Sequence, residues 1–210
     1  MSRKPASEWT SGEILFLKRL TTPWRIQSYL NRLPYNDQPT AMSPRRVMRE
    51  RAAHCFEGAL FAAAALRFQG FAPLVIDMAA RNDDDHVIAV FRINGLWGAV
   101  AKSNTTMLRF REPVYRTVRE LVMSYFEMYF NTRGVKSLRT YSRPVNLTRF
   151  DRRGWMTSET DLDYIGNHLY AIPHIDVVPP RQRRMLSPAD RDVVRACFLG
   201  SRKSGLFRPK

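Results

Sequence analysis

The stretch from Ala53 to Phe71 constrains the fold most, because it is apolar on nearly every side of a helix. It holds a run of four alanines, residues 62–65, with leucine and phenylalanine on either side. Ala and Leu are strong helix formers, and Gly70 suits the left-handed position that ends a helix. A helix that is apolar all round belongs in the interior of a domain. The sequence therefore predicts a central, buried helix.

Cys55 lies in the first turn of this predicted helix. The unpaired N–H groups and the dipole at a helix N-terminus favour a thiolate over a thiol. Cys55 is therefore a candidate nucleophile, although a buried structural thiol is a common use of free cysteine. The second cysteine, Cys197, lacks such a context and is interpreted as a core residue of the last helix.

The composition is that of one globular domain. The chain has 210 residues and 44% hydrophobic residues, enough to bury a full core. No run approaches eighteen apolar residues, so no membrane span is predicted. Residues 1–9 contain no apolar signal core, and two distant cysteines do not suggest a disulfide framework. A cytoplasmic protein with free thiols is expected.

The net charge of +15 comes mostly from arginines spread along the chain. Such an excess permits attraction to nucleic acid, to an anionic membrane surface or to an acidic protein, but a solvated surface is the favoured interpretation. Because no nucleic-acid-binding motif accompanies the charge, a nucleic-acid partner rests on charge alone. The sequence is silent on the oligomeric state.

Periodicity and turn signals predict an α+β order of elements. Amphipathic helices are expected in residues 12–33, and a short helix begins at Ser43-Pro44. A β-hairpin follows the central helix, because Asn94-Gly95 is a strong two-residue turn signal. The predicted segments are strands at 73–78, 86–93 and 96–103, a helix from Glu112-Pro113 to about 131, extended chain at 137–150, and helices at about 159–170 and 187–200.

These elements suggest a single domain over residues 1–200. Its core spans residues 43–110, with helical flanks at 12–33 and 112–200. The cysteine-bearing helix is expected to pack on a small antiparallel sheet. Residues 201–210 are predicted to be a basic, disordered tail. Pro144 argues against a central strand at 137–150.

A cysteine nucleophile requires a base near it in space. His86 opens the first strand of the hairpin directly after three aspartates, where it can reach the N-terminus of the cysteine helix. His54 is the neighbour of Cys55, and adjacent side chains at a helix start are expected to point apart. His168 and His174 have no supporting pattern. The predicted dyad is Cys55 with His86.

The spacing of these residues resembles the core of the transglutaminase-like superfamily, which is related in fold to papain. Cys55 is followed by Leu66-Arg67 and Gly70, then by a strand that begins at His86 and by Trp97 on the paired strand. The resemblance covers residues 45–104. It implies a papain-like or transglutaminase-like core and a thiol enzyme that acts on an amide or peptide bond, by hydrolysis or acyl transfer. The expected substrate is a peptide or protein amide.

The chain departs from this family at the third catalytic position. The family's aspartate, four residues after the tryptophan, is Ala101 here. Asn104 can orient a histidine as asparagine does in papain-like proteases, and it is the third predicted site residue. Ser103 and the aspartates at 83–85 are alternatives. Two other hypotheses remain. The site is a Cys-His dyad without a third member, or the protein is a catalytically inactive binding module that uses its basic surface to hold an acidic or nucleic-acid partner.

Neither a metal nor a cofactor is predicted. The chain has no paired-cysteine motif and no His-Glu-x-x-His helix. The three aspartates at 83–85 lack the spacing of a calcium loop, and no glycine-rich phosphate loop is present. The expected chemistry is therefore attack of the Cys55 thiolate on a carbonyl. The imidazole of His86 protonates the leaving amine, and the backbone N–H of Cys55 helps to bind the oxyanion.

Overall fold

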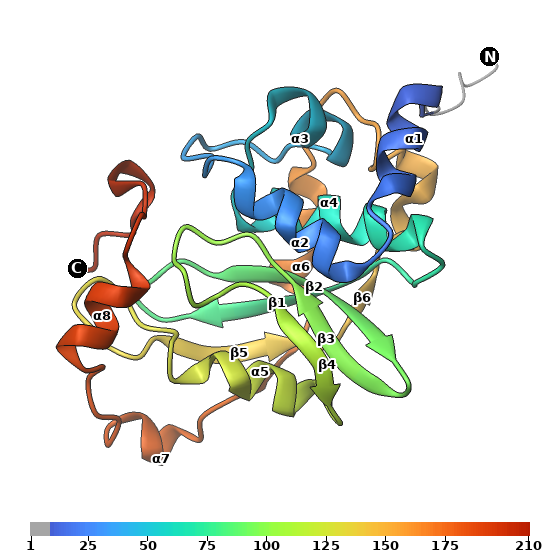
Figure 1. Ribbon diagram of the computed structural model, residues 1–210. Coiled ribbons are helices and arrows are strands. Elements are labelled where there is room, and N and C mark those ends of the chain that lie inside the picture. Colours follow the sequence, from blue (N-terminus) through green and yellow to red (C-terminus); the bar gives the residue numbers. More distant parts are fainter. Residues whose placement is uncertain (1–8) are drawn as a thin grey trace.

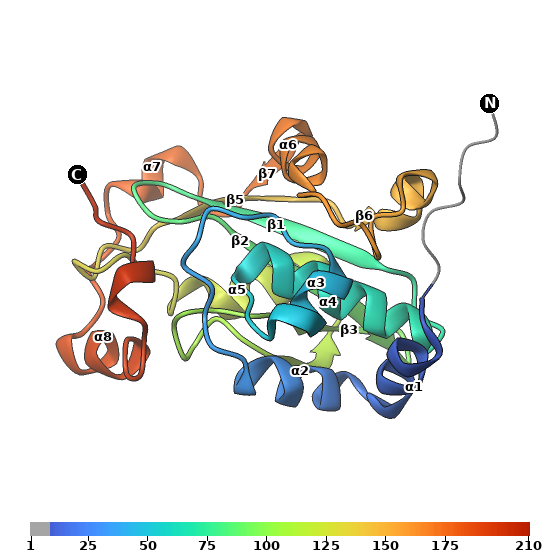
Figure 2. The same cartoon turned by 90° about the horizontal axis from the view of Figure 1, so that it is seen from above.

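One antiparallel sheet separates two layers of helices in the computed structural model, which describes residues 9–210 (Figure 1). Residues 1–8, part of the stretch used to predict the compartment, lie outside the described residues. Helices α1 to α4 cover one face of the sheet and α5 packs on the other, while α6 lies beside β6 and β7 when the sheet is seen from above (Figure 2). The predicted α+β class is confirmed.

The elements follow one another in the order that the sequence suggested, with more strands than expected. The helices are α1 (Ser11–Arg19), α2 (Pro23–Arg32), α3 (Pro44–Glu50), α4 (Cys55–Phe68), α5 (Val118–Phe126), α6 (Asp163–Ala171), α7 (Pro180–Arg183) and α8 (Arg191–Cys197), with 3-10 segments η1 (Leu147–Arg153) and η2 (Lys203–Gly205). The strands are β1 (Leu74–Ala80), β2 (His86–Ile93), β3 (Leu96–Val100), β4 (Arg111–Tyr115), β5 (Leu138–Ser142), β6 (Val145–Asn146) and β7 (His174–Asp176). Their order is β4-β3-β2-β1-β5-β7, and β6 pairs with β1.

The central helix α4 is well defined at both ends. Gly70 has φ +87°, and the N–H groups of Gly70 and Phe71 donate to the carbonyls of Arg67 and Leu66. This is the Schellman arrangement expected from a glycine after a helix. At the other end, the Glu57 carboxylate accepts the N–H of His54 at 3.0 Å, as the third residue of a capping box does.

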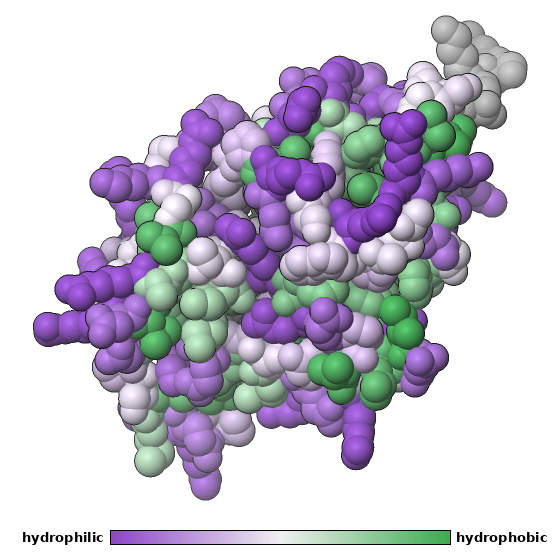
Figure 3. Space-filling model, in the orientation of Figure 1, coloured by the Kyte–Doolittle hydropathy of each residue, from purple (hydrophilic) through white to green (hydrophobic). Residues whose placement is uncertain are grey.

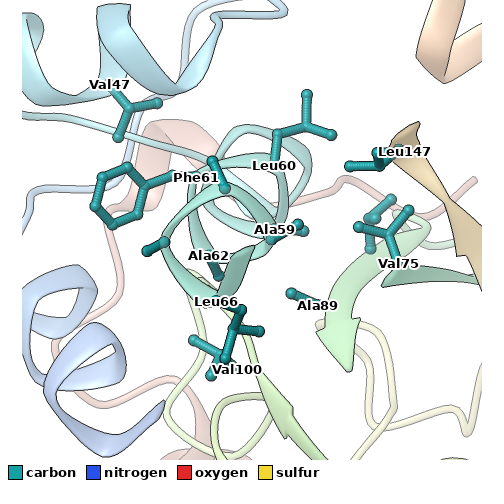
Figure 4. Close-up of a cluster of buried hydrophobic side chains, with 14 of the residues drawn as sticks. Val47, Ala59, Leu60, Phe61, Ala62, Leu66, Val75, Ala89, Val100 and Leu147 are labelled. Atoms are coloured by element: carbon teal, nitrogen blue, oxygen red, sulfur yellow. The ribbon is translucent and has the colours of Figure 1, made fainter. Parts of the chain in front are cut away.

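Helix α4 is buried along most of its length, as the sequence predicted. Its residues from Glu57 to Leu66 are buried. Figure 4 shows their side chains directed outward around the helix axis, toward α3, the sheet and η1. The labelled contacts around the helix are Val47, Val75, Ala89, Val100 and Leu147, all buried. Gly58 lets α4 approach the end of β3 closely, because a Cβ there would lie 2.3 Å from Lys102 Cβ.

The strands β1 and β2 are buried on both faces because α5 covers the far side of the sheet. Ile76, Ile88 and Val90 belong to a second core cluster with the buried residues of α5. The apolar residues expected to form a core stripe in the 112–131 segment are confirmed in part: Leu121, Val122, Tyr125, Phe126 and Tyr129 are buried, Val118 is partly buried, and Val114 is exposed.

The hairpin of β2 and β3 turns at Asn94-Gly95, as expected. Both residues have positive φ, 51° and 82°, which is the signature of a type I′ turn. The turn sets the register in which Ala89 faces Val100 and Arg92 faces Trp97. His86 is thereby fixed at the start of β2, beside the N-terminus of α4.

Several predicted boundaries are wrong; the helix expected to reach about 131 ends at Phe126, and the strand expected at 96–103 ends at Val100. Residues 111–115 form the edge strand β4 and not the start of a helix, which begins at Val118 after its cap Thr117. Strand β5 runs between β1 and β7 and is a central strand, because Pro144 lies just beyond its last residue, Ser142. The predicted helices at 12–33, 159–170 and 187–200 correspond to α1 with α2, to α6 and to α8.

The segment 201–210 was predicted as a disordered tail, but it folds back onto the domain. It includes η2, and Asn104, Arg133 and Asn82 hydrogen-bond to its backbone. Figures 1 and 2 show its red end at the edge of the molecule where the β1–β2 turn lies. The basic composition of the segment predicted a disordered tail, because composition does not show that side chains elsewhere in the chain hydrogen-bond to its backbone.

The surface in the view of Figure 3 is mainly hydrophilic, with separate hydrophobic patches. Large exposed apolar side chains include Trp24, Val114, Tyr170, Met185 and Leu199. Within residues 9–210, every helix falls short of the length and apolar character that a membrane span requires.

Candidate thiol site

Cys55 is the first residue of α4, and its half-buried side chain faces the turn between β1 and β2. The Cys55 Sγ lies 3.7 Å from the carbonyl oxygen of Asp85. A hydrogen bond of 2.7 Å from the Ala80 N–H to the Asp85 carboxylate closes this turn. The turn therefore places β2 and its first residue, His86, directly opposite the cysteine.

His86 is buried, 4% exposed; it lines the same cavity as Cys55, and its imidazole is one of the groups that lower the pKa of the thiol. Its Nε2 atom lies 2.9 Å from the carbonyl oxygen of Leu108. A carbonyl accepts only, so Nε2 carries the proton and Nδ1 is the ring nitrogen left for Cys55. The structure thus brings together the predicted dyad of Cys55 and His86.

His54 also shares a cavity lining with Cys55, and its imidazole lowers the pKa of the thiol. His54 is the N-cap of α4 and has an extended backbone, φ −94° and ψ −172°. Its Nε2 atom lies 2.7 Å from the Thr40 carbonyl oxygen and 3.5 Å from Glu57 Oε1. These contacts hold the His54 imidazole at the start of α4. Sequence position gave no direct signal for this second imidazole.

The buried Glu57 fixes the geometry of this helix start. Besides the His54 N–H, its carboxylate accepts the Met42 N–H at 3.0 Å, the Thr40 hydroxyl at 2.7 Å and the Asn36 amide at 3.0 Å. The loop before α3 is thereby held against the N-terminus of α4. Thr40 in turn supplies the carbonyl that contacts His54.

The two imidazoles favour the thiolate form of Cys55. Burial raises the pKa of the Cys55 thiol, but hydrogen bonds with His54 and His86 outweigh it and lower the pKa to about 5. Burial lowers the pKa of His54, but its hydrogen bond with Cys55 and the thiolate charge raise that pKa to about 9. Between these two values the favoured state is a thiolate beside an imidazolium.

The third predicted member, Asn104, has other partners. Its amide nitrogen donates to the carbonyls of Arg202 and Gly205, both at 2.9 Å, and its oxygen accepts the Arg202 N–H at 2.8 Å. The carbonyl of Leu108 takes the place opposite His86 in which Asn104 was expected. The geometry gives no support to Asn104 as the group that orients His86.

Ala101, the position of the family's aspartate, is fully buried and bonded through its backbone. Its N–H donates to Gln27 Oε1 at 3.0 Å, and its carbonyl accepts Gln27 Nε2 at 2.9 Å. Ser103, another alternative, hydrogen-bonds to Thr105. Among the aspartates, Asp83 accepts the Ser137 hydroxyl at 2.6 Å.

Two adjoining cavities open in front of Cys55. The inner cavity, of about 60 Å³, is lined by Cys55, His86, Asn104, Tyr129, Leu206 and Phe207 among others. The outer groove, of about 390 Å³, is lined by Asp37, His54, Cys55, Asp84 and Ser204 among others. Apart from histidines, the charged residues of both linings are aspartates. A protein with a net charge of +15 thus presents an acidic surface at its thiol.

Asp84 is the aspartate most affected by the thiol. Burial raises the pKa of its carboxyl group to about 6, and the Cys55 thiolate adds to this effect. The Tyr129 hydroxyl, buried behind the turn, donates to the Asp84 carbonyl at 2.8 Å. The acidic turn is therefore anchored by a buried tyrosine that lines the inner cavity together with Cys55.

Comparisons with protein-family models and with curated proteins found no match for the chain. Within residues 9–210, no group of three or more His, Cys, Asp or Glu side chains is arranged to hold a metal ion. Both cysteines are free, and Cys197 is buried in α8, as the sequence predicted.

Proposed function

We propose that the protein is a transglutaminase-like thiol enzyme that acts on an amide or peptide bond, by hydrolysis or acyl transfer. The observation that carries the proposal is a cysteine at a helix N-terminus that shares its cavity linings with two imidazoles, which lower the pKa of its thiol. Activated cysteine nucleophiles occur in such surroundings, where the thiolate is favoured and the thiol remains accessible. The family resemblance over residues 45–104 supports the same chemistry.

In the proposed reaction, the Cys55 thiolate attacks the carbonyl carbon of an amide and forms a C–S bond. The backbone N–H of Cys55, one of the free N–H groups of the first turn of α4, stabilises the oxyanion. The C–N bond then breaks, and the amine leaves with a proton from the imidazolium. Water resolves the thioester to a carboxylic acid, or an amine resolves it to a new amide, and the thiolate is restored.

His86 is the proton carrier in this proposal. The Leu108 carbonyl, 2.9 Å from Nε2, accepts the proton on that nitrogen and leaves Nδ1 available for the thiol. The role of orienting the base, which a carboxylate or amide performs in the family, is then taken by a backbone carbonyl. His54 supplies a second positive charge at the thiolate. We place this chemistry in the cytoplasm, whose reducing conditions maintain free thiols.

The proposal is tested by trapping the acyl-enzyme. The protein is mixed with p-nitrophenyl acetate, and its intact mass is followed with time, with and without a primary amine. We expect an acetyl adduct on Cys55 that turns over, none in Cys55→Ser, and slow acylation in His86→Ala. Equal acylation of the wild type and Cys55→Ser would refute the nucleophile. Peptides that contain glutamine then test amide substrates by mass change.

The alternative from the sequence, an inactive module that holds an acidic or nucleic-acid partner, makes a separate prediction. Its binding to DNA would fall steeply with salt, because each neutralised phosphate releases counterions. The acidic lining of the cleft does not favour this function at the thiol site. Lack of DNA binding at low salt would remove it.

A further inference from the structure

The segment 201–210 lies across the mouth of the cleft that contains Cys55. Residues Gly205, Leu206 and Phe207 line both the inner cavity and the outer groove. The segment thus occupies space that a substrate of the proposed enzyme would need. Its contacts indicate what kind of molecule fits there.

Asn104 binds the segment through its backbone. The carboxamide accepts the Arg202 N–H and donates to the carbonyls of Arg202 and Gly205, and the Ser201 hydroxyl donates to the Asn104 carbonyl at 2.9 Å. A side-chain amide that pairs with main-chain donors and acceptors recognises a peptide backbone irrespective of its side chains. Asn104 is 9% exposed, so this recognition is built into the cleft wall.

The cleft also limits the size of the side chain that the segment can carry at position 205. A Cβ at this position would lie 2.9 Å from two ring carbons of Tyr35 and 3.3 Å from the Asn104 amide nitrogen. A larger residue therefore cannot occupy the position without displacement of the segment. The next two residues, Leu206 and Phe207, are apolar and reach the cavity in front of Cys55.

Charge complements these contacts at the rim. The Arg202 guanidinium lies 2.9 Å from the Asp37 carboxylate, which also accepts the Ser204 hydroxyl. Farther along, Arg133 donates to the carbonyls of Pro209 and Lys210 at 2.9 and 3.0 Å. The basic segment thus faces the acidic side of the groove, and the hydrogen bonds from Arg133 hold its last two residues outside the groove.

We propose that the cleft is a peptide-binding groove whose preferred ligand is an extended basic segment with a small residue followed by two bulky apolar residues. Residues 202–207 are its resident occupant and compete with such a peptide for access to Cys55. This inference rests on the proposed function, since it names the substrate class of the same site. It accounts for an acidic cleft in a basic protein and for the partners of Asn104.

The test measures how fast a bulky maleimide modifies Cys55 at fixed pH. In Gly205→Val the added side chain meets Tyr35, so the segment is displaced, and we expect modification to be faster by about tenfold. The control is Leu199→Ala, just before the segment, because this side chain is 74% exposed and lines neither cavity. Leu199→Ala should react at the wild-type rate.

The synthetic peptide of residues 201–210, acetylated and amidated, is then added to Gly205→Val. We expect saturable protection of Cys55 by this peptide and none by a scrambled peptide of the same composition. Arg133→Ala, which loosens the clamp at Pro209 and Lys210 without contact with Cys55, should also react faster, and it replaces Gly205→Val if that variant fails to fold. A rate unchanged in both variants, or absence of protection, overturns the proposal.

The outcomes for the groove and for catalysis are distinguishable, because alkylation requires only a reactive thiol. Peptide protection without any acyl-enzyme would support the groove and refute the catalytic function. Acylation and turnover that are equal in the wild type and Gly205→Val, without peptide protection, would refute the groove and leave catalysis in place.

Discussion

The reactivity of Cys55 is expected to be nearly independent of pH between pH 6 and pH 8. With its pKa lowered to about 5, roughly nine-tenths of the thiol is already thiolate at pH 6. An ordinary cysteine, with a pKa near 8.5, would lose about 80-fold of its thiolate fraction between pH 8 and pH 6. A pH profile of iodoacetamide alkylation, read by peptide mass, separates the two cases.

The histidine variants give the sign of each contribution. Burial raises the pKa of the thiol, and His86→Ala removes one of the two imidazoles that lower it. The pKa of Cys55 should therefore rise in this variant. We expect the ratio of rates at pH 8 and pH 6 to rise above about tenfold in that variant. His54→Ala should shift the profile in the same direction. Its imidazolium persists in the wild type up to its pKa of about 9.

The control for this experiment is Cys55→Ser, which reports the reactivity of Cys197 alone. Cys197 is 1% exposed, and burial raises the pKa of its thiol, so its contribution should be small. A wild-type rate that falls between pH 8 and pH 6 as steeply as that of a free thiol would refute the thiolate–imidazolium pair. A profile unaffected by both histidine variants would refute their role.

Three further variants test the supports of the site. Gly58→Ala should destabilise the fold by about 1–3 kcal/mol in urea unfolding, since its Cβ would overlap Lys102, whereas Gly12→Ala, with nothing within 4 Å, should not destabilise it. Glu57→Gln should lower the free energy of unfolding by about 1–3 kcal/mol, since the carboxylate accepts hydrogen bonds from four donors. An unchanged urea midpoint would contradict this. The pKa of Asp84 is raised from its ordinary value of 3.8 to about 6, so the folded state binds this proton more tightly than the unfolded state does. The folded state therefore loses stability as the pH rises from 3.8 through 6. Asp84→Asn should therefore be more stable than the wild type at pH 8 but not at pH 3.5, as thermal unfolding at both values would show.

The parts of the fold that could be predicted are those whose signals are local. The apolar run before Gly70 can satisfy its side chains only inside the domain, and Asn94-Gly95 has few conformations other than a tight turn. These two features fix α4 and the hairpin, and with them the meeting of Cys55 and His86. Pairing of distant segments had no such signal. Glu112-Pro113 begins a helix by propensity, but edge pairing with β3 holds it extended.

The hydrogen-bond partner of His86 could not be predicted from the sequence because its position depends on backbone geometry. His86 faces a backbone carbonyl, that of Leu108, and every residue type supplies a carbonyl. The residue type at position 108 therefore does not reveal that its carbonyl accepts a hydrogen bond from His86. In the same way, Asn104 has the right chemistry to orient an imidazole, but its amide is used by the backbone of the 201–210 segment. Its partners lie about a hundred residues away and became evident only in the structure.

The absence of a carboxylate at Ala101 thus has a different meaning in the structure than in the sequence. A catalytic carboxylate fixes the imidazole tautomer and stabilises its positive charge. At this site the Leu108 carbonyl provides the first effect, since it accepts a hydrogen bond from Nε2. The second effect can come from the acidic turn, whose aspartates lie beside the thiol and both imidazoles. In the proposed mechanism, in which a fixed carbonyl orients His86 and nearby carboxylates stabilise its positive charge, no side chain is needed at position 101, and Ala101 is part of the core.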